Sequence, residues 1–162
     1  GAMLHVVNNA FNKGILFLAI GNVLQATRTS EVKGVTGLFR TMPITASFVV
    51  VGFLAATGFP PFGAFVSEFT ILRGMIAEGH VVAQVVYLAF LAVVFIGMGS
   101  ALLGMVHGEP GAPLDASGPH ETLASVLPLA VLTALVLLLG TYITPGLRDL
   151  IEQAAGTPGG LR

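Results

Sequence analysis

Two ionisable side chains, Lys13 and Glu68, lie within apolar stretches of the sequence, where a charge is costly. On membrane-insertion scales such a residue costs about 3 kcal/mol, so it is usually retained for a purpose, most often the movement of protons or ions. A lysine amine suits this work because its charge state responds readily to its surroundings. Lys13 and Glu68 are therefore candidate proton carriers.

Lys13 is the last member of a polar row formed with His5 and Asn9. Successive members are four residues apart, so on a helix each step rises about 6 Å and the row covers one face over about 12 Å. A gap of about 6 Å is too long for a direct hydrogen bond. The row is thus predicted to hold a chain of waters through which protons pass, with the Asn9 amide orienting water.

Simpler interpretations exist for each of these residues. Lys13 could extend its amine to a membrane interface, and His5 could sit at that interface or bond a neighbouring carbonyl. Asn9 alone could serve as an interhelical hydrogen-bonding group. Glu68 follows Pro60-Pro61 closely, so it could be an ordinary carboxylate at a helix N-terminus, favoured by the helix dipole.

The composition points to a protein surrounded by lipid. Hydrophobic residues make up 54% of the 162 residues and charged residues only 9%, with a mean hydropathy of +0.90. Soluble domains carry about 25% charged residues. A net charge of −1 argues against a nucleic-acid partner, and the absence of cysteine excludes disulfides and thiolate metal sites.

Five apolar stretches are long enough, or nearly so, to cross a bilayer, which takes about 17–25 residues. They are continuous, whereas the strands of a membrane barrel alternate in hydrophobicity. The sequence therefore predicts an all-α integral membrane bundle of about five transmembrane helices, one of them short and broken near Pro60-Pro61. We expect a single transmembrane domain over 1–146 and a tail over 147–162, with spans at about 3–26, 43–59, 62–78, 81–106 and 122–144.

The remaining chemistry-bearing residues give no further site. His80, His107 and His120 fall at span ends or in a loop and are expected to be solvated. No cluster has metal-ligand spacing, and no glycine-rich phosphate loop or serine elbow is present. We therefore predict no metal site and no cofactor.

Three segments resemble a known family, the antiporter-like membrane subunits of respiratory complex I and of membrane-bound nickel–iron hydrogenases. The first is LHVVNNAFNKGILFLAIGNVLQA, where the family has a histidine, a second histidine four residues later, a lysine and an LLFL-like run. The second is GFLAATGFPPFGAFVSEFTIL, similar to the start of the family's broken helix. The third and weaker match, GPHETLASVLPLAVLTALVLLLGTYITPGL, looks like the end of the hydrogenase-4 component F type.

The resemblance implies roles for particular residues. Lys13 would be a central proton-relay lysine with His5 as its neighbour, and Glu68 would be the ionisable group of the broken helix near the proton exit, next to Ser67 as a supporting hydroxyl. The family's second histidine is Asn9 here, which can orient water but cannot carry a proton. A proton path made only of side chains would therefore be interrupted at Asn9.

The resemblance also implies a setting. The chain would be a redox-centre-free, proton-translocating subunit of a hydrogenase or NADH:quinone oxidoreductase complex in a prokaryotic cell membrane, beside other membrane and peripheral subunits. Family members have many more than five helices, so we expect a C-terminal portion. Two alternatives stay open: a stand-alone cation/proton antiporter component, or a non-catalytic membrane anchor or truncated product.

Overall fold

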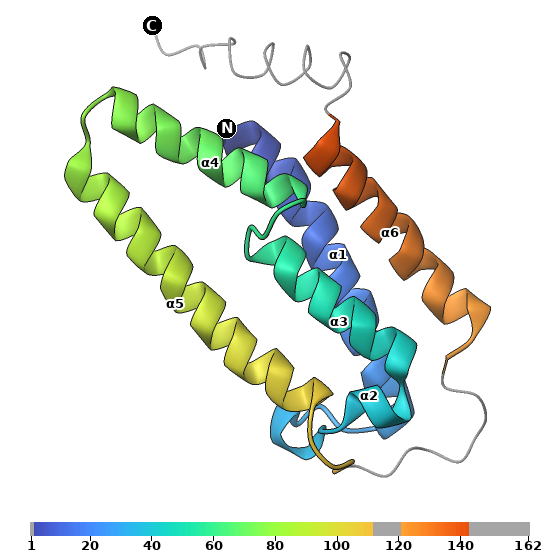
Figure 1. Ribbon diagram of the computed structural model, residues 1–162. Helices are drawn as coiled ribbons and strands as arrows, with labels where there is room; N and C mark the ends of the chain where they lie inside the picture. The colour runs from blue at the N-terminus through green and yellow to red at the C-terminus, as the bar shows by residue number, and fades with distance from the viewer. Residues whose placement is uncertain (1, 112–120, 143–162) are drawn as a thin grey trace, which may run out of the picture.

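The computed structural model describes residues 2–111 and 121–142, and within these residues every regular element is a helix (Figure 1). Two short elements, the 3-10 helix η1 (Val32–Gly34) and α2 (Leu38–Thr41), occupy the connector after the first helix. The long helices are α1 (Ala2–Thr27), α3 (Pro43–Ala56), α4 (Gly63–Ala77), α5 (Val81–Val106) and α6 (Leu123–Thr141).

Each of the five predicted apolar stretches corresponds to one long helix. The prediction of all-helical structure is therefore confirmed for the described residues, whereas the short elements η1 and α2 were not predicted. The tail 147–162, the end of the last predicted span after Tyr142, and His120 lie outside the described residues. The proposed domain boundary at 146 stays a prediction.

Local chemistry accounts for the helix ends. α3 starts with Pro43 in its first turn, where the missing N–H would have no helical partner. The chain then breaks between α3 and α4, where Gly58 has a φ of 69°, a left-handed conformation that glycine adopts without steric cost. α6 begins with a capping box, in which the Thr122 hydroxyl accepts from the Ser125 N–H and the Ser125 hydroxyl accepts from the Thr122 N–H.

α1 is the central helix of the bundle. It contacts α3, α4 and α6. After α4 the chain turns back, and α5 runs alongside α4 and α3 on the side away from α6 (Figure 1). α3 and α4 follow one another along α1. The break between them is half-buried at Gly58, exposed from Phe59 to Pro61 and buried again at Phe62. The core is aliphatic and includes Ile15, Val23, Val49, Val106, Leu129 and Val136.

Two helices, α5 and α6, are long and apolar enough to cross a membrane, and α3 is apolar but shorter. α5 is exposed along most of its length, with its buried residues confined to Gly99, Met105 and Val106 near its end. An apolar helix without a protein covering requires lipid or another apolar surface around it. The length and apolar surface of α5 and α6 thus agree with a location in a membrane.

Candidate functional site

The predicted residues His5 and Ser67 meet across the interface between α1 and α4. His5 Nδ1 lies 3.1 Å from Ser67 Oγ, and that hydroxyl also donates to the carbonyl oxygen of Ala64 at 2.8 Å. A serine hydroxyl has one proton. Because Ser67 gives it to Ala64, Ser67 can only accept from His5, so the imidazole carries a proton on Nδ1.

Glu68, the residue after Ser67, is buried although it can carry a charge. Its side chain is 9% exposed, and its carboxylate lies directly against Gly58 in the break. A Cβ atom at position 58 would overlap that carboxylate. Gly58 therefore provides both the left-handed backbone of the break and the space that Glu68 occupies.

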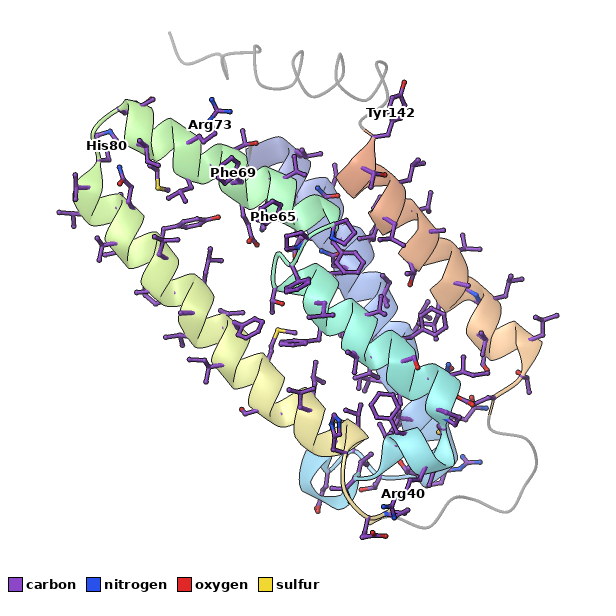
Figure 2. All side chains as sticks on the ribbon, in the orientation of Figure 1. Arg40, Phe65, Phe69, Arg73, His80 and Tyr142 are labelled. Atoms are coloured by element: carbon purple, nitrogen blue, oxygen red, sulfur yellow. The ribbon has the colours of Figure 1, made fainter. Side chains whose placement is uncertain are left out.

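Glu68 has no ion pair among the described residues. Arg73, the nearest cation along α4, is exposed, and Figure 2 shows its side chain on the outer side of that helix. Their spacing of five residues also disfavours pairing, since helical neighbours are three or four residues apart. The carboxylate thus combines burial with the absence of a countercharge in the described part of the chain.

Lys13 occupies a different face of α1 from His5. The predicted row is half-buried at His5 and Asn9 but exposed at Lys13. A four-residue step advances about 40° around a helix, so two steps carry the row from the edge of the packed face to the exposed face. The described residues therefore do not bring Lys13 to Glu68.

The exposed face around Lys13 is apolar. Val6, Phe17 and Leu24 share its side of α1 and are 65%, 75% and 46% exposed. An ammonium group among such side chains would be poorly placed against lipid. This face is suited to contact with further protein.

Sequence reasoning missed two buried amides on α1, Asn8 and Asn12, which are 0% and 1% exposed. Asn12 Nδ2 donates to the carbonyl oxygen of Ala55 at 2.8 Å, one of the last carbonyls of α3, which lacks a partner within the helix. Asn8 lies against Gly63, where a Cβ would overlap its amide. The signal was present: Leu4, Asn8, Asn12 and Ile15 follow the helical period and share one face.

Helix α6 also packs against the break between α3 and α4. A Cβ at Gly140 would overlap the carbonyl oxygen of Pro61 and approach the backbone of Gly63. The backbones of α6 and of the break are therefore in direct contact. α1 and α6 therefore both pack against α4, the helix that carries Glu68.

Of the other histidines, the structure describes His80 and His107, and neither contributes to the candidate site. His80 is exposed and lies 3.2 Å from the exposed carboxylate of Glu78, at the α4–α5 turn labelled in Figure 2. His107 is exposed and bonds the carbonyl of Leu103 at the end of α5. Among the residues that the structure describes, no group of three or more histidine or acidic side chains could hold a metal ion.

Comparison with known proteins identifies the family. Residues 1–97 match the model of the family described as NADH:quinone oxidoreductase/Mrp antiporter, TM. The chain belongs to this family. The expected resemblance is therefore confirmed, and with α5 and α6 it supports an integral membrane location.

Three curated relatives show the range of the family. The chain is 34% identical over 88% of its length to hydrogenase-4 component F homolog of Methylacidiphilum infernorum. It is 28% identical over 98% to hydrogenase-4 component B of Escherichia coli, and 33% identical over 98% to NADH-quinone oxidoreductase subunit L of Pseudomonas aeruginosa. The matches span 29%, 25% and 26% of these relatives.

Proposed function

We propose that the chain forms the proton-translocating part of an antiporter-like membrane subunit in a hydrogenase or NADH:quinone oxidoreductase-type complex. The observation that carries the proposal is the environment of Glu68. A buried carboxylate without a countercharge among the described residues sits at a broken helix, and its neighbour Ser67 contacts a titratable imidazole from another helix. Such groups in a membrane protein mark proton pathways.

The proposed mechanism uses changes of local charge. A charge that shifts along the membrane axis causes Lys13 to release its proton, which passes through bound water and the His5 region to Glu68. Ser67 holds the imidazole in the tautomer with Nδ1 protonated, so Nε2 remains open to exchange a proton with water. Electron transfer is assigned to partner subunits.

The arrangement in the membrane is part of the same proposal. The five long helices would all span or enter the bilayer of a prokaryotic cell membrane, as one domain over 1–146. Further helices of the same assembly would cover the face of α1 that carries Lys13, Val6 and Phe17, which supplies the protein contact that this ammonium requires. Peripheral subunits would supply the redox chemistry.

Proton flux in proteoliposomes tests the proposal, with the assembly purified from its native membrane. Lys13→Ala and Glu68→Gln should each lower flux by at least about tenfold, as expected for loss of a proton-carrying group. The matched controls Arg73→Ala and Glu78→Gln remove exposed charges from α4 and its end and should leave flux unchanged. Normal flux in both Lys13→Ala and Glu68→Gln would refute the assignment.

A second candidate function, cation/proton exchange without a redox partner, has support from other relatives. The chain is 40% identical over 58% of its length to Na(+)/H(+) antiporter subunit A1 of Staphylococcus haemolyticus, and 28% identical over 97% to a Na(+)/H(+) antiporter subunit of Bacillus subtilis. This function predicts sodium-dependent proton movement in vesicles that hold no electron donor or acceptor. If the chain were a non-catalytic anchor, neither proton flux in the assembly nor sodium-dependent proton movement would depend on it.

A further inference from the structure

The amide of Asn8 is fully buried, and neither its oxygen nor its nitrogen has a hydrogen-bonding partner among the described residues. An unpaired polar group is most costly inside a membrane protein, where bulk water cannot reach it. Asn12, one turn further along α1, also has an unpartnered oxygen although its nitrogen is bonded. Asn8 and Asn12 together therefore leave three buried polar atoms that need a hydrogen-bonding partner between α1 and the break.

The position of Asn8 identifies what surrounds this site. Its amide lies against Gly63, the first residue of α4. The first N–H groups of a helix have no acceptor within that helix, and the residue before α4, Phe62, makes no side-chain capping bond. Asn8 therefore faces the N-terminal end of α4, where the first backbone N–H groups have no acceptor within the helix.

Asn8 is also the middle member of a row that connects α1 to both helices beside the break, α3 and α4. His5 contacts Ser67 of α4, Asn8 lies against Gly63, and Asn12 bonds Ala55 of α3. The spacing of His5, Asn8 and Asn12 is three and then four residues, which keeps all three side chains on one face of a helix.

We infer that Asn8 and Asn12 hold ordered water at the break between α3 and α4, and that this water forms the part of the proton path along α1 that leads to His5. The inference rests on the proposed function and replaces Asn9 by Asn8 as the amide that orients water. An amide cannot carry the proton itself; it fixes a water molecule that accepts a proton on one side and releases one on the other. Buried water typically makes about three hydrogen bonds to groups that are otherwise unsatisfied. The free atoms of the two amides and the first turn of α4 can supply them.

The first test is a high-resolution density map of the native assembly. A water molecule is expected within about 2.7–3.2 Å of Asn8 Oδ1 or Nδ2. A map in which the Asn8 amide bonds only to protein groups, with no water beside it, would overturn the inference. This readout does not depend on activity.

The second test measures proton flux in substituted assemblies. Asn8→Leu removes both polar atoms at similar volume and should lower flux roughly tenfold, the effect of one lost water-mediated bond in the path. Asn8→Ser leaves space and a hydroxyl for water and should restore at least half of the flux. A merely structural amide predicts no such rescue.

Matched controls separate this inference from general damage to α1 or α4. Asn22→Leu removes a half-buried amide of the same helix that donates to the Ser125 carbonyl, away from the break, and should leave flux unchanged. Gly63→Ala pushes into the Asn8 amide and should act like Asn8→Leu, whereas a Cβ at Gly74 meets nothing. Gly74→Ala should therefore behave like the native protein.

The outcomes distinguish the two proposals. If Lys13→Ala and Glu68→Gln abolish flux while Asn8→Leu transports normally, the water site is refuted and the proposed function stands. If all of these variants transport normally, the proposed function fails as well. If Asn8→Leu does not assemble, the density map and the comparison of Asn8→Ser with Gly63→Ala decide the matter.

Discussion

Replacing Gly58 by alanine tests directly whether the break exists to hold the Glu68 carboxylate. Gly58 and Gly79 are matched, because both adopt left-handed backbone, with φ of 69° and 73°, and each lies just beyond the end of a helix. They differ in their neighbours: a Cβ at Gly58 would overlap Glu68, whereas a Cβ at Gly79 would meet nothing within 4 Å. The pair therefore separates backbone strain from the clash with the carboxylate.

The expected loss of stability is the sum of the backbone strain and the clash with the carboxylate. Left-handed backbone costs an alanine about 1–2 kcal/mol at either position. At Gly58 the new methyl group must also push aside the buried Glu68 carboxylate, the end of a flexible side chain, which adds up to about 3 kcal/mol. We expect Gly79→Ala to lose about 1–2 kcal/mol of stability and Gly58→Ala more than this, up to about 5 kcal/mol.

The assay is the thermal stability of the purified assembly, combined with proton flux. Gly58→Ala should lower the unfolding midpoint more than Gly79→Ala and should also reduce flux, because the carboxylate is displaced. In a double-mutant cycle, Glu68→Ala should bring the effect of Gly58→Ala down to that of Gly79→Ala, since the clash is gone. Equal losses for the two alanine variants, or strictly additive effects with Glu68→Ala, would contradict the reasoning.

Two further predictions concern α6. Gly140→Ala should lose at least about 1–3 kcal/mol, because its Cβ would overlap the backbone of Pro61; Gly97→Ala, which meets nothing, should be neutral or stabilising by up to about 1 kcal/mol. Comparable melting temperatures for the two variants would count against the close approach. Thr122→Ala removes the hydroxyl that accepts from the Ser125 N–H and should cost about 1 kcal/mol, measured as a lower unfolding midpoint that Thr122→Ser restores.

The helices could be predicted from the sequence because long apolar runs leave few alternatives once lipid is the solvent. The break could be predicted as well, since Pro60-Pro61 cannot continue a helix. In the structure the break is longer than the predicted Pro60-Pro61, because α3 ends at Ala56 and α4 starts at Gly63. Turn residues such as Gly58 explain the difference, because a left-handed residue ends the helix before the prolines are reached.

The candidate site could be predicted only in part. His5 and Ser67 meet in the structure and Glu68 is the next residue along α4, but the choice between the adjacent amides Asn8 and Asn9 depends on the rotation of α1. Spacings of three and four residues fit one helical face equally well. Our proposal favours Asn8 because its amide lies against Gly63 in the first turn of α4, and a long-range contact of this kind is not contained in a sequence pattern.

The contact at Gly140 also fixes the register of α6. A shift of this helix by one residue would turn it by about 100° and move it about 1.5 Å along its axis. Either neighbour, Leu139 or Thr141, would then direct a side chain at the backbone of Pro61, where the structure leaves no room even for a methyl group. A single glycine near the end of α6 thus fixes both the rotation of this helix about its axis and its position along that axis.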